Sequence, residues 1–115
     1  MLRKDLLDNL LAFRREREWE QFHNPRNLAA ALAIEAAELQ QIFLWARDDD
    51  VEARAAERRD AVEQEMADIT MLLSYLCHDL EIDLDTAVRR KMEINRLKYP
   101  VDKCRGSSKK YDQLG

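Results

Sequence analysis

The chain has 115 residues, a formal net charge of −4 and 37% charged residues, with only two glycines and two prolines. This length suits one domain with a modest core, and the scarcity of helix breakers favours an almost wholly helical fold over a parallel sheet. A general nucleic-acid-binding role is disfavoured because such proteins present a basic face, and no run approaches the roughly 18 apolar residues of a membrane span.

Four helices are expected, and the first two are separated by a clear break. The first runs from about residue 4 to residue 21, with leucines on one side and charged residues on the other. Asn24 is a natural N-cap and Pro25 suits the first position of a helix. The second helix should therefore begin there and continue to about Arg47.

The third helix follows the polar connection 48–50 and reaches about Leu80. Its early part, through Glu57, shows little apolar periodicity, whereas the pattern from Val62 onward is clear. Residues 69–77 are apolar on nearly every side, which predicts a helix covered all round.

Asp83 should cap the fourth helix, which is expected to run to Lys98 before Pro100 ends it. The segment 101–115 is basic, contains serines and lacks apolar periodicity, so a loop is expected there. The chain is thus divided into a helical domain, 1–100, and a basic C-terminal tail.

Two acidic pairs carry the chemistry of this sequence: Glu35 with Glu38, and Glu65 with Asp68. Each pair has three-residue spacing and interrupts a helical stripe of apolar residues, so the carboxylates should face the interior. Buried carboxylates are rare unless they are paired or bind metal. No matching row of Lys or Arg is apparent on either stretch, which favours a metal.

The charge balance indicates which metal. Two carboxylates about 4 Å apart repel by roughly 4 kcal/mol at an effective dielectric of about 20, and a divalent cation removes that conflict. Oxygen ligands suit Mg²⁺, Mn²⁺ or Ca²⁺ better than zinc. Because Mg²⁺ often completes its shell with substrate phosphates, the cluster indicates a nucleotide or another phosphoester.

A solvated helix face and a di-iron centre are the alternatives to this metal site. A single acidic pair of this kind is usually solvated, but two pairs that interrupt apolar stripes on separate helices favour metal binding. A di-iron bundle also places carboxylates on facing helices, but it needs E-x-x-H on two of them. His23 and His78 do not supply two such motifs.

Lys91 and Asn95 continue an apolar stripe that begins at Leu84 and Val88 on the fourth helix. Lys91 could neutralise a phosphate, and Asn95 could bind a metal-bound oxygen or a sugar hydroxyl. The alternative is that Lys91 only lays its aliphatic stem over the core. Basic residues of the tail could close over phosphates or could simply be solvated.

Trp45 lies seven residues after Glu38, on the same predicted helical face, and could stack on a base beside the metal site. Trp19 ends the first helix near His23. Each tryptophan could instead be a core residue.

Four segments resemble a known family, and the resemblance covers about residues 10–112. They are F-H-N-P-R-N-L at 22–28, E-A-A-E-L-Q-Q-I-F-L-W at 35–45, E-M-A-D-I at 65–69 and K-M-E-I-N-R-L-K-Y-P at 91–100. Together they resemble the MazG-like all-α nucleoside triphosphate pyrophosphatases, and within that family the dCTP pyrophosphatases. The resemblance implies a four-helix MazG-like bundle that forms a homotetramer, a dimer of dimers.

The resemblance also implies an activity and a site. The expected reaction is hydrolysis of a deoxynucleoside triphosphate, dCTP or a related or modified pyrimidine, to monophosphate and pyrophosphate, which would sanitise the nucleotide pool. Glu38 would activate the water. The other implied roles are metal binding (Mg²⁺, with Mn²⁺ as a possible substitute) by Glu35, Glu38, Glu65 and Asp68, triphosphate binding by Lys91 and Asn95, and base binding by Trp19, His23 and Trp45, with Arg26 and Asn27 nearby.

One position departs from the pattern of the eukaryotic dCTP pyrophosphatases. Leu72 stands where those relatives carry a tyrosine, four residues after the last acid. The sequence alone leaves open whether Tyr75 supplies the missing polar contact. The departure affects the choice among cytosine, modified cytosine, thymine and uracil more than it affects the reaction.

A non-enzymatic helical module that oligomerises or regulates, with a structural metal site or simple salt bridges, is the alternative from another class. An N-terminus without a signal-peptide core and two cysteines, interpreted as reduced thiols, favour a cytoplasmic protein with no membrane partner.

Overall fold

The computed structural model describes residues 1–114, and every regular element in them is a helix. The all-α prediction is confirmed, but these residues form six α-helices where four were expected, together with two short 3₁₀ helices. The residues fall into two compact units, Met1–Glu81 and a second unit that begins at Ile82. None of the described helices is both long and apolar enough to cross a bilayer.

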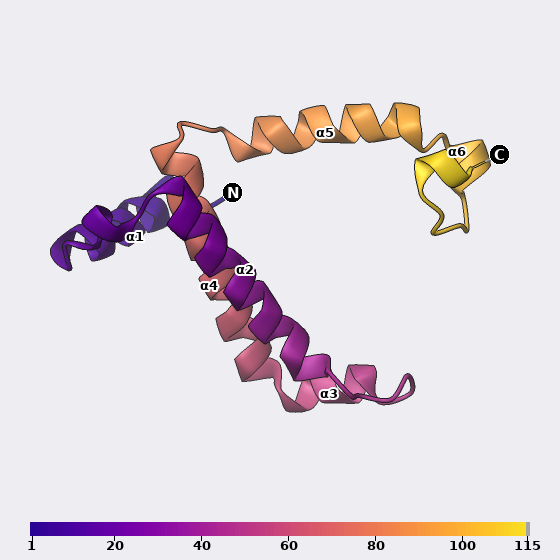
Figure 1. Cartoon of the computed structure of the whole chain (residues 1–115), viewed down its shortest axis with the longest axis horizontal. Helices are drawn as coiled ribbons and strands as arrows, with labels where there is room; N and C mark the ends of the chain where they lie inside the picture. Colours follow the sequence, from indigo (N-terminus) through magenta and orange to yellow (C-terminus); the bar gives the residue numbers. More distant parts are fainter. Residues whose placement is uncertain (115) are drawn as a thin grey trace. The chain divides into compact units, whose positions relative to one another are not determined.

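The first unit is built around an antiparallel pair, α2 (Pro25–Phe43) and α4 (Arg59–Asp79), joined through α3 (Val51–Glu57) (Figure 1). Near the end of the pair away from α3, α1 (Lys4–Glu16) packs against α4. The side chains of Leu10, Leu28 and Tyr75 form the core where these three helices meet.

The first helix ends at Glu16, five residues before its predicted end. Glu18 takes a left-handed backbone, with φ of 54°, and the 3₁₀ helix η1 (Trp19–Phe22) follows. The apolar side of α1 ends at Phe13, and the Trp19 ring turns back to meet the Phe13 ring edge-on at 5.7 Å. Residues 15–18, which precede Trp19, are charged and exposed, so no apolar contact extends the helix.

Helix α2 begins as predicted and ends earlier than predicted. The Asn24 side chain accepts a hydrogen bond from the Asn27 amide at 2.8 Å, which confirms the cap. At the other end α2 stops at Phe43, and Arg54 of α3 donates to the Ile42 carbonyl at 3.0 Å. A cation at the C-terminal end of a helix satisfies a free carbonyl and the helix dipole.

The predicted third helix is two helices, because Arg58 leaves the helical backbone between α3 and α4. Within residues 69–77 only Ser74 and Tyr75 are buried, and the other side chains are half-buried. The expectation that this helix is covered all round is therefore wrong within one chain.

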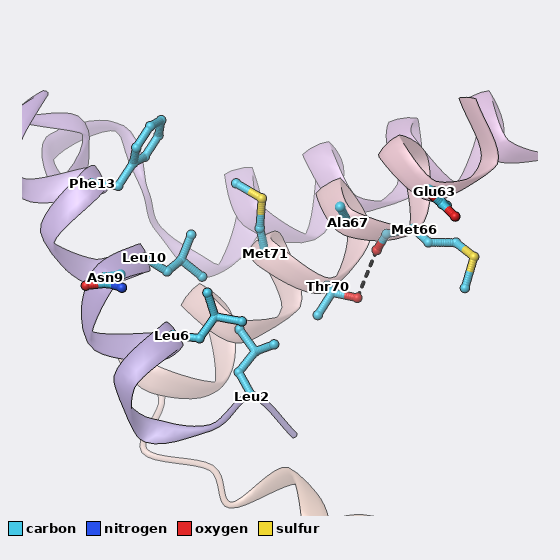
Figure 2. Close-up of a pocket in the computed structure, with 10 residues that line it drawn as sticks. All are labelled: Leu2, Leu6, Asn9, Leu10, Phe13, Glu63, Met66, Ala67, Thr70 and Met71. Atoms are coloured by element: carbon cyan, nitrogen blue, oxygen red, sulfur yellow. Dashed lines mark hydrogen bonds between the residues drawn. The ribbon is translucent and has the colours of Figure 1, made fainter. Parts of the chain in front are cut away.

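An apolar groove of about 610 Å³ follows the contact between α1 and α4 (Figure 2). Leucine side chains of α1 face Met71 across it. Its lining residues are Leu2, Leu6, Asn9, Leu10, Phe13, Glu63, Met66, Ala67, Thr70 and Met71.

The second unit contains α5 (Leu84–Lys98), α6 (Val101–Cys104) and the 3₁₀ helix η2 (Tyr111–Gln113). Asp83 caps α5 as predicted, accepting from the Thr86 amide at 3.3 Å. The tail is more regular than the predicted loop, because the Tyr111 ring packs edge-on against Tyr99 at 6.3 Å and lies under the Lys98 ammonium. These contacts connect residues too far apart in sequence to appear as periodicity.

Candidate functional site

Three of the four predicted acids converge between α2 and α4. Glu35 and Glu38 lie one turn apart on α2, and Glu65 faces them from the antiparallel α4; one oxygen of each lies within 4.8 Å of the others. The three-residue spacing places both α2 carboxylates on one face of that helix. Asp68 is not part of this trio, although its negative charge acts on Glu35.

The three carboxylates differ in exposure. Glu35 and Glu65 are half-buried, and one oxygen of each is shielded from solvent without a hydrogen-bond partner among residues 1–114. Glu38 is exposed, so the prediction that it faces the core is wrong for one chain. Its place at the mouth of the cluster leaves it in contact with water.

The crowding of negative charge changes the titration of Glu35. Its pKa is raised from 4.5 to about 7, chiefly because of the neighbouring Glu65 carboxyl, and further because of burial and of the Glu38 and Asp68 carboxylates. Neighbouring carboxyl groups resist ionising together because their negative charges repel, and this repulsion raises the pKa of one of them. The cluster therefore holds either a proton or another cation.

These donors fit a hard divalent cation. Carboxylate oxygens are the ligands that Mg²⁺ and Mn²⁺ prefer, and two of the oxygens are buried without another partner. Within the described part of the chain, no Lys, Arg or His forms an ion pair with Glu35, Glu38 or Glu65.

We expect the metal-free protein to lose stability as the pH rises through 7. A proton bound to Glu35 in the folded state, with a pKa of about 7, is already released in the unfolded state above about pH 4.5. The stabilisation is complete below the unfolded pKa and is lost as the pH passes the folded pKa. In the presence of chelator, the melting temperature should fall more steeply between about pH 5 and pH 8 for wild type than for Glu35→Gln. Parallel profiles would contradict this assignment.

A cavity of about 380 Å³ opens beside the acids, and two of the residues that line it were not indicated by the sequence patterns. Gln41 and Arg58 line it together with Glu38 and Glu65, so a single basic residue, and not a matching row of Lys or Arg, lies beside the acids. Gln41 lies three residues after Glu38, a spacing that could have indicated it. Arg58 is placed here by the break between α3 and α4, which the sequence did not reveal.

The predicted base-binding residues lie in the first unit but not on one helical face. Trp45 follows the end of α2 with φ of 69° and is 88% exposed, so the argument that it continues the face of Glu38 is wrong. Trp19 is 41% exposed in η1. His23 is half-buried between η1 and α2. Their roles stay predictions.

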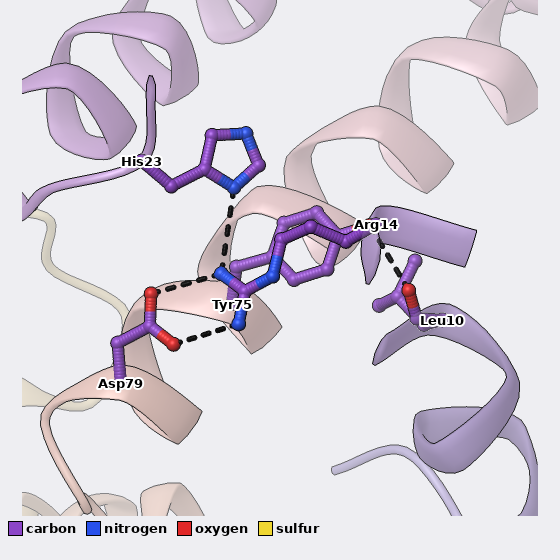
Figure 3. Close-up of polar contacts among 5 residues, drawn as sticks. All are labelled: Leu10, Arg14, His23, Tyr75 and Asp79. Carbon is purple, nitrogen blue, oxygen red and sulfur yellow. Dashed lines mark hydrogen bonds and ion pairs between the residues drawn. The ribbon is translucent and has the colours of Figure 1, made fainter. Parts of the chain in front are cut away.

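His23 belongs to a polar cluster that the sequence did not predict (Figure 3). Arg14 of α1, 4% exposed, donates two hydrogen bonds of 2.9 Å to the two oxygens of Asp79, near the end of α4. The guanidinium lies 4.6 Å from the centre of the Tyr75 ring. The Tyr75 hydroxyl donates to the Leu10 carbonyl at 3.2 Å and so is already engaged in the core.

Lys91 and Asn95 belong to α5 in the second unit. Lys91 is exposed and Asn95 is half-buried, and no residue of α5 is buried within the described chain. The expected interior-facing stripe is therefore absent from α5 by itself. Their approach to the phosphates stays a prediction.

Comparison with known proteins identifies a matching family and several similar proteins. Residues 30–114 match the MazG-like family. The human and bovine proteins named dCTP pyrophosphatase 1 are 41% and 43% identical to this chain over 89% of it, and the chain spans 61% and 62% of their lengths. The crystal structure of a pyrophosphatase from Archaeoglobus fulgidus aligns with a TM-score of 0.82 and 45% identity, over 84% of this chain and 91% of that one.

Proposed function

The chain belongs to the MazG-like family, and from that premise we propose that it is a nucleoside triphosphate pyrophosphohydrolase. Its substrate would be a deoxynucleoside triphosphate, dCTP or a related pyrimidine, and its products the monophosphate and pyrophosphate. The names of the similar proteins support the reaction class. A cytoplasmic role in removing unwanted nucleotides belongs to the same proposal.

The observation that carries this proposal is the trio Glu35, Glu38 and Glu65 beside an open cavity. Glu35 and Glu65, whose shielded oxygens lack partners, would hold Mg²⁺, with Mn²⁺ as a substitute and Asp68 as a fourth acid. The bound cation would offset the charge of the phosphates and orient them. A triphosphate without a cation would be repelled by these acids.

Glu38 is the best-placed residue to accept a proton from the attacking water. It is the exposed member of the trio and lines the cavity, so a water molecule can reach it while the two half-buried carboxylates are engaged. A carboxylate positioned in this way acts as a general base. Lys91 and Asn95 would hold the triphosphate.

The test is pyrophosphate release from a panel of triphosphates. Purified protein with Mg²⁺ should release pyrophosphate from dCTP, and chelator should stop the reaction. Absence of release from every triphosphate would favour the alternative, a non-enzymatic helical module with a structural metal site. Comparison of dCTP, dTTP, dUTP and purine triphosphates would identify the preferred base.

Replacement of Trp45 by alanine should weaken selectivity for the base more than it affects the phosphate chemistry. The ring is 88% exposed and makes no ring contact within residues 1–114, so it is available to stack on a base. Such stacking contributes about 1–3 kcal/mol. Kinetics on dCTP and on a purine triphosphate provide the measurement. Equal losses of kcat/KM on both substrates would remove Trp45 from the base pocket.

We also propose that the protein is a homotetramer, a dimer of dimers. The apolar groove between α1 and α4, with Met66 and Phe13 exposed at its edges, is surface of the kind that a second copy buries. Light scattering at micromolar concentration should give four times the chain mass of 13.6 kDa. A mass of one chain would contradict any assembly, and a mass of two chains would leave only the dimer.

A further inference from the structure

Arg14, Asp79, Tyr75 and His23 form a cluster that has no part in the chemistry of the acids (Figure 3). Arg14 and Asp79 come from α1 and α4, and His23 lies between η1 and α2. An ion pair so well shielded on its arginine side is costly to desolvate, and in some proteins such a pair specifies an arrangement of neighbouring groups. The neighbouring group here is His23, which Arg14 contacts.

Arg14 restricts which ring nitrogen of His23 carries the proton. The Arg14 Nη1 atom lies 3.4 Å from Nδ1 of His23 and 2.9 Å from an Asp79 oxygen. A guanidinium can only donate hydrogen bonds, so Nδ1 must accept. A neutral imidazole that accepts at Nδ1 carries its hydrogen on Nε2.

The surrounding groups favour the neutral form of the ring. Burial, followed by the Arg14 guanidinium, lowers the pKa of His23 below its usual value, and the Asp79 and Glu20 carboxylates oppose this only in part. The Tyr75 ring lies 5.2 Å away, between centroids, and limits rotation of the imidazole. The two hydrogen bonds from Arg14 to Asp79 fix the plane of the guanidinium.

The other ring nitrogen of His23 is free to meet a ligand. Nε2 points away from the ion pair (Figure 3), and no residue in 1–114 forms a hydrogen bond with it. His23 also directly precedes Asn24, the cap of α2, the helix that carries Glu35 and Glu38. A polar atom fixed in direction and left unpartnered is typical of a recognition group.

We propose that the Arg14–Asp79 ion pair is a positioning device that fixes the tautomer of His23, so that Nε2 presents an N–H donor to an acceptor on the base of the bound nucleotide. Pyrimidine bases offer such acceptors as carbonyl oxygens, and cytosine also offers a ring nitrogen. The base-reading step rests on the proposed function, whereas the fixed tautomer belongs to the protein without nucleotide. The pair touches neither the reacting phosphate nor the acids, so its role is positioning and not catalysis.

Nitrogen NMR of the metal-free protein without nucleotide tests the tautomer. Two-bond proton–nitrogen correlations resolve both ring nitrogens of each histidine, and the chain has only two, His23 and His78. His23 of wild type should show Nε2 protonated and Nδ1 bare. In the double variant Arg14→Met/Asp79→Leu the two nitrogen shifts should move toward each other as both tautomers become populated.

The matched control is Arg59→Met, which breaks an exposed arginine–carboxylate pair with Glu63 and should leave the His23 signals unchanged. If the double variant does not fold, Arg14→Lys serves instead, because an ammonium lacks the planar fork that reaches Asp79 and His23 together. A wild-type ring protonated at Nδ1, or a tautomer unchanged in the folded variants, would overturn the proposal.

Steady-state kinetics on dCTP test the second half. KM of the folded variant, Arg14→Met/Asp79→Leu or Arg14→Lys, should be roughly 2- to 10-fold higher than that of wild type, which corresponds to the loss of one neutral hydrogen bond. Its kcat should stay within about twofold of wild type. A fall in kcat at constant KM would overturn the base-reading step. If wild type hydrolyses no triphosphate, the proposed function fails while the NMR result still decides the tautomer.

Discussion

Glu38→Gln should lower kcat by about 10²- to 10⁴-fold while leaving the helical fold intact, because an amide of nearly the same volume cannot accept the proton of the attacking water. Glu38 is exposed at the edge of the acidic trio, so the substitution should not disturb the core. Pyrophosphate release and circular dichroism of the same preparation are the two measurements needed. Near-wild-type turnover would exclude Glu38 from the catalytic role.

Glu63→Gln is the matched control for this variant. It removes one negative charge from α4, but Glu63 pairs with Arg59 on the exposed side of that helix and lies outside the trio. Its turnover should match wild type. The metal-free Glu38→Gln protein should also melt a few degrees higher than wild type, because the Glu38 carboxylate is one of the charges that disfavour ionisation of Glu35.

Arg14→Met should strongly destabilise the first unit. It leaves the Asp79 carboxylate, 28% exposed at its side chain, without the two hydrogen bonds that now satisfy it. Breaking a buried pair from one side costs about 3–5 kcal/mol, and the partial exposure of Asp79 favours the lower value. Urea unfolding at fixed protein concentration should show a lower midpoint with an unchanged slope.

The double variant Arg14→Met/Asp79→Leu distinguishes the loss of the ion pair from the cost of leaving one charge unpaired. Replacing both partners with apolar side chains should recover much of the lost stability, because no unpaired charge remains. Arg59→Met, which breaks an exposed pair, should change the unfolding free energy by about 1 kcal/mol or less. Equal costs for Arg14→Met and Arg59→Met would mean that the buried pair is unimportant.

Local signals in the sequence predicted local structure well. Asn24 and Asp83 cap helices as expected, because an N-cap depends on residues only three positions apart. Glu35, Glu38 and Glu65 lie close together as expected, because α2 and α4 pack against each other, although Glu38 is exposed and Asp68 lies outside the trio. The placement of side chains that follow helical periodicity was therefore partly predictable from the residues alone.

Features that depend on distant contacts were not predictable in this way. Arg14 and Asp79 are 65 positions apart, and each resembles an ordinary charge near a helix end. Trp19 returns to Phe13 after the end of α1, and Trp45 takes a left-handed backbone after the end of α2. A bulky residue at positive φ is disfavoured by its own sterics, so only the folded chain shows it.

The antiparallel arrangement of α2 and α4 makes assembly of the acidic site part of folding itself. Glu35 and Glu65 are distant in the unfolded chain and meet only when this hairpin closes, so the unfolded state has no comparable cation site. A cation that binds only the folded state adds its binding free energy to the folding equilibrium, about 2.7 kcal/mol at a concentration one hundred times its Kd. Repulsion between the same carboxylates opposes hairpin closure when the cation is removed. If the proposed function holds, the supply of divalent cation would set how much of the chain is folded as well as how fast the folded chain turns over.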